Sequence, residues 1–491
     1  MRCLRIFAAA LMGGAAIQAE ARADYTTTIN PATNWGAWQG WGSSLAWWAN
    51  RFGSRDDMAD VLYTLNTVLF TGNQGTQSLP GLGLNVARYN VGGTGVYSIN
   101  VGGATHRPNN PSSLPAFKEM QTYWLDWASS SPASASWDWR ADPNQRNMMW
   151  KARDRGANIF ELFSNSPPWW MCRNASTAGS DTGGDNLQPW NYRSFAVYMA
   201  TVAKYSHDHW GVNFSSVEPF NEPSANWWKY PGSQEGCHFA VATQESVIVC
   251  LRTELDNRGL DSMPIAAADE NTVDGALSTW NSLSLASRSK VGRINTHGYQ
   301  GGGGDRTGLY IAAHNNGKGL WNSEYGEGDA TGLSLASNLN LDLRRLHPTV
   351  WCYWQPFDGG GWGLIQSSPA DNWVGRANPK YYVLAQYTRH IRPGMTLIDG
   401  GEGNTIAAYD RANRRLVLVT ANYGTAQWID YDLSKYGTVN GNAGGRVDRW
   451  ETQTGGGDMY AYHADTRLKG KRFRSWFPAN TVQTFVVNDI Y

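Results

Sequence analysis

The chain has 491 residues, of which 41 are basic and 41 acidic, and charged residues make up only 17% of it. The balanced charge argues against a strongly basic surface for nucleic acid, and the length leaves room for a large core and more than one domain. Tryptophan (25 residues) and tyrosine (23 residues) are abundant. Such a composition fits a large core, and it also fits a surface on which sugar rings stack, because sugars have apolar C–H faces and polar edges.

The first residues have the features of a secretory signal peptide. Arg2 and Arg5 precede an apolar run over 6–17, and Ala21-Arg22-Ala23 offers a cleavage site between small residues. The run is too short to cross a bilayer, and no later stretch reaches the required length of about 18 apolar residues. We therefore expect residues 1–23 to be removed, leaving a soluble, secreted, monomeric chain that does not enter a membrane. A buried N-terminal helix is the alternative.

Loss of that segment leaves four cysteines, which allow three pairings in an oxidising compartment: Cys172, Cys237, Cys250 and Cys352. Cys172 and Cys237 fall in long loops of adjacent units of the fold described next, so we expect them to form a disulfide. The other two fall within a predicted helix and a predicted strand and are expected to be buried thiols. No C-x-x-C spacing indicates zinc. Asn174 and Asn213 begin N-glycosylation sequons, which matter only in a eukaryotic host.

Short, nearly continuous apolar runs alternate with amphipathic segments along most of the chain. Runs of this kind are typical of parallel strands that are buried on both faces. The runs are 40–46, 82–90, 157–164, 216–221, 264–269, 293–297, 319–324 and 349–354. This repeated alternation predicts an α/β fold in which a (β/α)8 TIM barrel occupies residues 38–392.

Helices are expected between these strands. Ser54 and Asp57 form a capping box, and an apolar face that continues through Leu65 and Leu69 predicts a helix after it. Proline at the start and glycine at the end bound two further helices. These two helices are 143–156 and 189–211. The remaining helical segments are 242–257, 274–288, 307–316, 330–346 and 378–391.

After Pro393 the pattern changes to short alternating runs separated by turn residues. The runs are 407–409, 415–422, 428–433, 446–452 and 481–487. They predict an attached C-terminal β-sandwich over residues 393–491. The Thr-rich residues 24–37 are expected to contribute a strand to it.

Two carboxylates fall where barrel strands end. The fourth strand ends in Asn221-Glu222-Pro223 and the seventh in Ser323-Glu324-Tyr325. Function in a barrel lies at the C-terminal ends of the strands. Glycoside hydrolysis needs such a pair, one acid to protonate the departing oxygen and one carboxylate to attack the anomeric carbon or activate water. Asn-Glu-Pro alone could be an ordinary turn before a helix; the second glutamate and the strand count favour a catalytic pair.

These motifs resemble those of clan A glycoside hydrolases, and of family 30 in particular. The resemblance covers nearly all of the mature chain and implies a barrel joined to a sandwich, with retention of anomeric configuration. It implies that Glu222 is the acid/base and Glu324 the nucleophile. Residues 40–49, Gly-Trp-Gly-Ser-Ser-Leu-Ala-Trp-Trp-Ala, resemble the endo-β-1,6-galactanase branch more than the glucosylceramidase or xylanase branches.

Four polar residues at strand ends are expected to assist. Asn221 can bond the sugar 2-hydroxyl, a contact that strengthens in the transition state. A cation at Arg88 would hold the nucleophile ionised, although a structural salt bridge is the alternative. By resemblance, the Tyr299 hydroxyl would donate a hydrogen bond to Glu324. For His297, a structural role and substrate contact are equally compatible with the sequence.

Tryptophans at the same rim are candidates for stacking on sugars. By resemblance, Trp354 would form the platform beneath the cleaved sugar. Further candidates are the loop residues Trp47, Trp170 and Trp227, together with the adjacent Trp169 and Trp228. For each of them, packing in the core is the alternative. Other acids near the strand ends are less direct candidates: Glu218, Asp269, Glu270, Glu327 and Asp329. The mechanism requires neither a metal nor a cofactor.

The sequence therefore predicts a secreted retaining endo-hydrolase of β-1,6-galactan, such as the side chains of arabinogalactan. Another family 30 activity, β-1,6-glucanase or xylanase, is the rival within this class. A non-catalytic carbohydrate-binding barrel is the rival from another class, and the presence of both glutamates argues against it. A protease or lipase is disfavoured because neither Gly-x-Ser-x-Gly nor a zinc motif is present.

Overall fold

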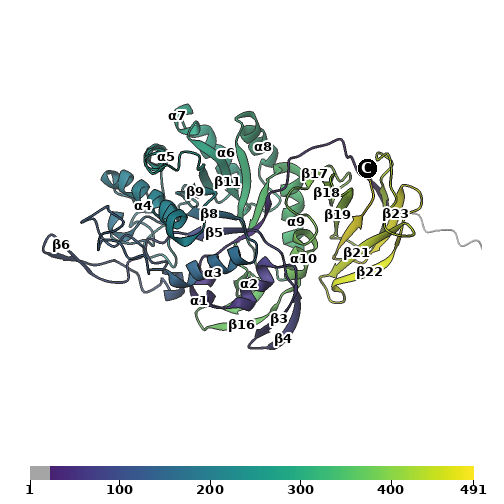
Figure 1. Cartoon of the computed structure of the whole chain (residues 1–491), viewed down its shortest axis with the longest axis horizontal. Helices are drawn as coiled ribbons and strands as arrows, with labels where there is room; N and C mark the ends of the chain where they lie inside the picture. The colour runs from purple at the N-terminus through teal and green to yellow at the C-terminus, as the bar shows by residue number, and fades with distance from the viewer. Residues whose placement is uncertain (1–22) are drawn as a thin grey trace, which may run out of the picture.

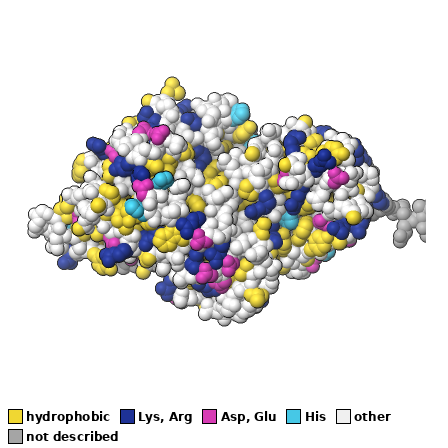
Figure 2. All heavy atoms as spheres, viewed as in Figure 1, with side chains coloured by type: hydrophobic (Ala, Val, Ile, Leu, Met, Phe, Trp, Pro, Cys, Tyr) yellow, Lys and Arg dark blue, Asp and Glu magenta, His cyan; other side chains and the backbone are white. Residues whose placement is uncertain are grey.

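The computed structural model describes residues 23–491 (Figure 1). The predicted signal peptide lies outside the described residues except for Ala23. Within the described part, no helix combines the length and apolarity needed to cross a bilayer. Basic and acidic side chains are interspersed on the face drawn in Figure 2, as the balanced composition suggests.

A closed parallel barrel forms the larger part of the molecule, so the predicted TIM barrel is confirmed. Neighbouring strands follow chain order, and the last strand pairs with the first. The strands are β2 (Gly40–Ser44), β5 (Val86–Asn90), β8 (Ile159–Phe163), β9 (Ser216–Glu218), β10 (Ile265–Glu270), β11 (Val291–His297), β12 (Gly319–Tyr325) and β13 (Val350–Tyr353). Each coincides with one predicted apolar run, because each is buried on both faces.

Helices surround the barrel and cover the outer faces of its strands (Figure 1). The helices are α1 (Trp48–Phe52), α2 (Asp56–Tyr63), α3 (Pro143–Asp154), α4 (Tyr192–Tyr205), α5 (Val241–Asp256), α6 (Val273–Ser282), α7 (Leu285–Arg288), α8 (Arg306–Asn315), α9 (Leu333–Leu341) and α10 (Pro379–Thr388). Pro143 begins α3 and Gly211, with φ of 62°, ends the segment that follows α4. These boundaries follow from proline fitting a first turn and glycine the left-handed region.

The predicted helix that extends to Leu69 is wrong in its second half. α2 ends at Tyr63, and no side-chain cap from Ser54 is present at its start. Leu69 lies instead in β3 (Thr67–Gly72), which forms a hairpin with β4 (Gly75–Pro80). Its side chain is 74% exposed. The helical spacing of Leu69 was therefore coincidental, and the turn at Gly75, with φ of 97°, favours a hairpin.

The C-terminal domain consists of two sheets around a core of their own. One sheet has the order β1 (Tyr25–Thr28), β20 (Gln427–Asp432) and β23 (Arg472–Phe477). The other has the order β17 (Thr396–Ile398), β18 (Thr405–Asp410), β19 (Arg415–Asn422), β24 (Thr481–Val487), β21 (Arg446–Gln453) and β22 (Met459–Arg467). Rings from both sheets, such as Tyr431 and Phe485, are 4.9 Å apart in this core. β1 pairs in parallel with β20, so the start of the described chain lies within this domain.

Helix α10 joins the two parts. Gln386 donates to Thr452 of β21 at 2.8 Å and accepts from Thr484 of β24 at 2.8 Å. Apolar side chains of α10 and of the six-stranded sheet belong to one buried cluster, which includes Leu384 and Val486. The barrel and the sheet therefore share a continuous interface.

Long insertions follow several barrel strands and build the rim above their C-terminal ends. The insertion after β5 includes β6 (Ile99–Val101) and β7 (Ala104–His106), and the one after β13 includes β14 (Phe357–Asp358), β15 (Ile365–Ser368) and β16 (Trp373–Ala377). Loops at this end of a barrel carry its binding residues.

The predicted disulfide between Cys172 and Cys237 is not formed. All four cysteines of the described residues are free thiols. The Cys172 thiol lies 3.7 Å from the carbonyl oxygens of Pro167 and Pro168, and the Cys237 thiol lies 3.4 Å from that of His238. Each sulfur contacts the backbone of its own loop, although Cys172 lies close enough to Cys237 to add to the effect of burial, which raises the pKa of the Cys237 thiol.

Candidate active site

Two buried glutamates meet above the barrel axis. Glu222 follows β9 and is 7% exposed, whereas Glu324 lies near the end of β12 and is 4% exposed. One oxygen from each carboxylate and one nitrogen of His297 lie within 4.8 Å of one another. The barrel thus brings together two carboxyl groups that are about one hundred residues apart in the chain.

The Glu222 backbone has an unusual conformation that its neighbours hold in place. Its φ is 49°, in the left-handed region that non-glycine residues rarely adopt. Its amide donates to the carbonyl of Asp269 at 2.8 Å, and its own carbonyl accepts from Trp228 Nε1 at 2.9 Å. At the other end of the side chain, Asn271 Nδ2 donates to Oε1 at 2.6 Å. These contacts direct the carboxyl group towards Glu324.

Glu324 has a different set of partners. Arg88 Nη1 donates to its Oε2 at 3.1 Å, and the Tyr299 hydroxyl donates to its Oε1 at 3.0 Å. Burial raises the pKa of this carboxyl to about 7, and the positive charges of His297 and Arg88 act in the opposite direction. The ionised form of Glu324, whose side chain is largely buried, is therefore held by two cations and one hydroxyl.

His297 lies beneath the two glutamates and is completely buried. Its Nδ1 is 3.3 Å from Glu222 Oε1 and 3.5 Å from Glu324 Oε1, and its Nε2 is 3.3 Å from Asp269 Oδ1. Burial favours the neutral ring, but the charges of Glu324 and Asp269 raise the pKa of His297 well above its usual value. The structure therefore favours a charged positioning residue over a substrate contact.

A buried network supports this arrangement from inside the barrel. Arg88 pairs with Glu161 at 2.9 Å and with Asp269 at 2.5 Å, in addition to Glu324. Arg293 also pairs with Glu161. Although Asp269 is buried, the positive charges of Arg88 and His297 hold its pKa well below the usual range. Buried charges are tolerated only when they are paired in this way, and removing one partner costs about 3–5 kcal/mol.

Glu218, the last residue of β9 and four residues before Glu222, differs from the other acids. It is fully buried, and burial together with the charges of Asp269 and Glu161 raises its pKa well above the usual value. Its Oε1 accepts from the amide of Phe220 at 3.2 Å. These surroundings favour the protonated form of Glu218.

A cleft of about 440 Å³ opens above the glutamates. Aromatic walls and amide side chains surround it: Trp47, Trp227, Trp354, Trp362, Asn165, Asn221, Gln234 and Asn271. Trp47 and Trp354 meet edge to face with ring centroids 4.9 Å apart. The Oδ1 atom of Asn221 is buried and accepts no hydrogen bond within residues 23–491. A cleft with flat apolar walls and inward-facing amides is suited to binding a sugar chain. The paired carboxyl groups are suited to cleaving that chain.

Comparisons with known proteins agree with this geometry. A sequence model of O-glycosyl hydrolase family 30 matches residues 24–287. The chain is 51% identical to an endo-β-1,6-galactanase of Hypocrea rufa over 470 residues, which cover 96% of each chain. The chain belongs to glycoside hydrolase family 30.

More distant relatives extend the picture. An exo-β-1,6-galactobiohydrolase of Bifidobacterium longum is 25% identical over 90% of this chain and 38% of its own length. Among solved structures, a conserved exported protein from Bacteroides fragilis has a TM-score of 0.75 at 19% identity, over 94% of this chain and all of its own. The catalytic domain of a family 30 xylanase from Talaromyces cellulolyticus has a TM-score of 0.68, also at 19% identity, over 94% of this chain and 100% of that one. The solved structures establish the shared fold.

In this family 30 chain, the cleft contains most of the residues that the sequence singled out. Asn221, Tyr299, Trp47, Trp227 and Trp354 line it together with the two glutamates. Arg88 and His297 lie directly below it and contact the glutamates.

Trp170 is the exception, because it lines a different cleft with Trp127 and Trp190. The position of its loop after β8 correctly indicated the rim but did not indicate which side of the loop Trp170 would face. Trp169 and Trp228 are the other two tryptophans that the sequence suggested for stacking. Both are largely buried; Trp169 lines the same cleft as Trp170, and Trp228 lines neither cleft.

Several lining residues were not predicted. Asn271 comes two residues after Asp269, at the end of β10, so its place at the strand end was a usable signal. Trp362 and Asp358 lie in the glycine-rich insertion after β13, and Gln234 lies in the loop that carries Trp227. Such loops are positioned by tertiary contacts, so their sequences do not reveal which side chains face the cleft.

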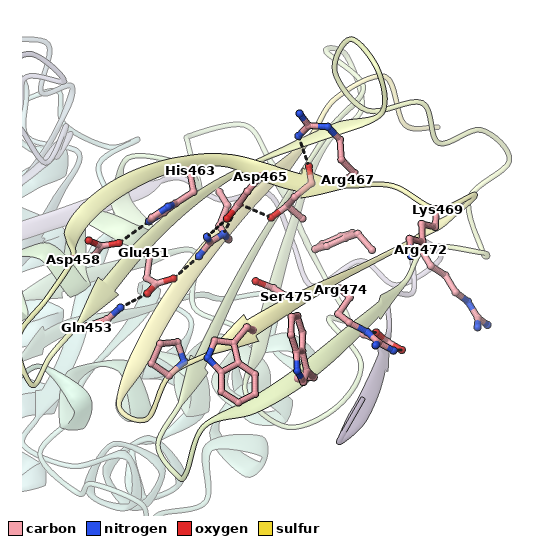
Figure 3. A pocket seen from close by; sticks show the side chains of 17 residues that line it. Glu451, Gln453, Asp458, His463, Asp465, Arg467, Lys469, Arg472, Arg474 and Ser475 are labelled. Carbon is pink, nitrogen blue, oxygen red and sulfur yellow. Dashed lines mark hydrogen bonds and ion pairs between the residues drawn. The ribbon is translucent and has the colours of Figure 1, made fainter. Parts of the chain in front are cut away.

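The C-terminal domain contains a wider groove of about 980 Å³ between β22 and β23 (Figure 3). Its charged side chains are engaged with one another. Arg449 pairs with Asp465 at 2.8 Å and also with Glu451, and His463 pairs with Asp458 at 2.7 Å. Neither Glu222 nor Glu324 lines it. This groove is therefore separate from the candidate active site.

Proposed function

We propose that the chain is a secreted, retaining endo-β-1,6-galactanase. The observation that carries the proposal is the 51% identity with the Hypocrea rufa endo-β-1,6-galactanase across 96% of both chains. The paired glutamates in an aromatic cleft supply the chemistry that such an activity needs.

The two glutamates have different roles in this proposal, and their partners support the assignment. Glu324 accepts from the cation Arg88 and from Tyr299, contacts that favour a carboxylate and hence a nucleophile. Glu222 accepts from the neutral amide of Asn271 and shares His297 Nδ1 with Glu324, but within residues 23–491 it pairs with no arginine. That environment is compatible with a group that alternates between acid and base.

The reaction proceeds in two displacements. Glu324 attacks the anomeric carbon while Glu222 gives its proton to the departing glycosidic oxygen, so the C–O bond to the leaving sugar breaks as the C–O bond to Glu324 forms. Glu222, now ionised, takes a proton from water, and that water attacks the anomeric carbon and releases Glu324. The short distance between the carboxyl groups leaves Glu324 within reach of the sugar, as direct attack requires.

Residues of the cleft bind and orient the sugar in this scheme. Asn221, whose buried Oδ1 lacks a partner within the described residues, accepts a hydrogen bond from the sugar hydroxyl next to the reacting carbon. Trp354 and Trp47 form the floor against which the cleaved sugar packs, and Trp227, which is 51% exposed, extends the apolar wall outwards. Arg88 and His297 act through the glutamates.

Product analysis on a panel of polysaccharides tests the proposal. β-1,6-galactan should yield a series of oligosaccharides at early times, which indicates internal cleavage, whereas β-1,3-galactan, β-1,6-glucan and xylan should remain intact. A single disaccharide product from the start would indicate exo action. Preferential cleavage of glucan or xylan would refute the proposed specificity while leaving the hydrolase assignment in place.

Two variants test the roles of the glutamates. Glu324→Gln should abolish turnover of every substrate. Glu222→Ala should keep activity on aryl galactosides whose leaving group needs no proton, and azide should increase it by replacing water in the second step. Glu402→Gln, which alters an exposed acid of the C-terminal domain, is the control. Full activity of Glu222→Ala on galactan would show that the assignment is wrong.

A further inference from the structure

A second aromatic cleft lies on the barrel rim, apart from the glutamates. It has a volume of about 640 Å³, and four tryptophans line it: Trp127, Trp169, Trp170 and Trp190. The insertion after β5 supplies the first, and the loop between β8 and α4 supplies the other three. Nothing in the reaction described above uses these residues.

Two of these rings are exposed on a rigid base. Trp190 is 74% exposed and Trp127 is 42% exposed, whereas Trp170 is 8% exposed. Trp170 Nε1 donates to the carbonyl of Trp124 at 3.0 Å, and the Trp127 and Trp170 ring centroids are 5.8 Å apart. The His106 ring meets Trp127 edge to face at 4.7 Å. Large exposed aromatic side chains gathered in one depression mark a binding surface more often than a core.

Polar groups suited to hydroxyls surround these rings. Asn191 Nδ2 donates to Gln188 Oε1 at 2.8 Å, and both side chains line the cleft. Arg173 is exposed and lines the cleft beside them. Apolar faces with amide and guanidinium donors at their edges match the two surfaces of a sugar ring.

The second cleft repeats the composition of the catalytic cleft except for its acids. Each is lined by four tryptophans with asparagine and glutamine side chains, but no aspartate or glutamate lines the second one. Without a carboxyl pair it cannot hydrolyse a glycosidic bond, so its chemistry is limited to binding.

The two clefts are also close together. Asn165 lines the catalytic cleft, and Trp169 lines the second one, four residues later on the same loop. Four residues span at most ~14 Å even when fully extended. One polysaccharide chain can therefore reach both clefts.

We propose that the cleft of Trp127, Trp170 and Trp190 is a second carbohydrate-binding site that holds another stretch of the β-galactan chain during catalysis. This site rests on the proposed function for the identity of its ligand. It raises the affinity for polymeric substrate, because a chain bound at two places is released more slowly than one bound at the catalytic cleft alone. Short oligosaccharides occupy only the catalytic cleft, so the second site does not increase their affinity.

Binding to an inactive parent tests the proposal without turnover. In the Glu324→Gln background, Trp190→Ala and Trp127→Ala should each weaken binding of soluble β-1,6-galactan by about 3- to 10-fold in affinity electrophoresis, as expected for the loss of one aromatic contact. Trp476→Ala is the matched control, since Trp476 lies on the C-terminal domain and is also 42% exposed. The control should bind galactan as the parent does.

Kinetics in the active background supply the second measurement. Trp190→Ala should raise KM for galactan and leave kcat/KM for a short aryl galactoside unchanged. Unaltered polymer binding in both tryptophan variants would overturn the second site while leaving the proposed function intact. An equal loss on the short substrate would also overturn it, because the residues would then belong to the catalytic cleft. A parent that neither binds nor cleaves galactan would overturn the proposed function and, with it, the ligand of this site.

Discussion

Arg88 Nη1 donates a 3.1 Å hydrogen bond to Glu324 Oε2, and both side chains are buried. The same guanidinium pairs with Asp269 and Glu161, so its position is fixed from three sides. The cation that favours the ionised Glu324 is thus part of the barrel interior and does not depend on a mobile loop. This links the packing of the barrel to the protonation state of the proposed nucleophile.

Replacing Arg88 by lysine should therefore impair catalysis mainly at low pH. Lysine retains the charge but loses the planar fork that reaches three carboxylates. A weaker cation contact raises the pKa of Glu324, and only the ionised carboxylate attacks, so the acidic limb of the kcat/KM profile should move to higher pH. Below that pKa, kcat/KM should fall roughly 10-fold for each unit of the rise.

Arg293→Lys is the matched control for this prediction. Arg293 is buried and pairs with Glu161, but it forms no ion pair with Glu324. Its replacement should lower the melting temperature without moving the acidic limb. If both variants shifted the limb equally, a general loss of packing would explain the effect better than the Arg88–Glu324 contact.

Tyr299→Phe should also shift the acidic limb to higher pH, because it removes the 3.0 Å hydrogen bond to Glu324 Oε1 and retains the ring. Loss of a donor to a carboxylate disfavours its ionised form. kcat should fall, and the melting temperature should change little. Tyr325→Phe provides the comparison, since that hydroxyl donates to the carbonyl of Ser334 instead. A Tyr299→Phe enzyme with an unaltered pH profile would argue against this role.

Glu218→Gln and Asp269→Asn should differ in their effect on stability. Burial raises the pKa of Glu218 and so favours its protonated form, and an amide of the same shape should leave activity and melting temperature nearly unchanged. Asp269 is ionised and pairs with Arg88 and His297, so its neutral replacement leaves buried cations uncompensated. That loss should cost about 3 kcal/mol of stability. Thermal unfolding at pH 7 distinguishes the two, and a strongly destabilised Glu218→Gln protein would contradict the neutral state of Glu218.

The barrel could be predicted from sequence because its strands are buried on both faces. β2 and β12, for example, are short runs that contrast with the polar loops around them. The predicted strand ends therefore also place Glu222 and Glu324 at one rim. The hairpin of β3 and β4 was missed because its exposed Leu69 continued the spacing of a helix by chance.

Loop residues could not be placed in the same way. Trp170 and Trp227 both follow barrel strands, yet only Trp227 lines the catalytic cleft. The direction of a loop side chain depends on long-range contacts, such as the bond from Trp170 to the carbonyl of Trp124. β22 and β23 were also missed, because their residues are partly exposed and mix charged with aromatic side chains.

The free thiols give a further prediction. The mature chain, denatured without reductant, should react with four equivalents of a thiol reagent, because none of its cysteines is bridged. The native protein should react slowly at Cys172, since burial raises its pKa to about 12. Two reactive thiols in the denatured chain, with a peptide linking Cys172 to Cys237, would instead support the disulfide that the sequence suggested.

The last prediction concerns the configuration of the product. An oxygen of Glu222 and an oxygen of Glu324 lie within 4.8 Å of each other. Retaining enzymes have carboxyl groups about 5–5.5 Å apart, whereas inverting enzymes need about 6.5–9.5 Å to accommodate a water molecule between the carboxylate and the sugar. The observed separation agrees with the shorter range, so Glu324 itself should attack and form a covalent glycosyl-enzyme. Two inversions at the same carbon restore the starting configuration, and a β-linked galactan should therefore release β-configured reducing ends first. Proton NMR during the first minutes of hydrolysis, before mutarotation, measures this directly. Initial appearance of the α anomer would rule out double displacement, and a mass increase of one galactosyl unit on the Glu324 peptide after trapping with a slow substrate would confirm it.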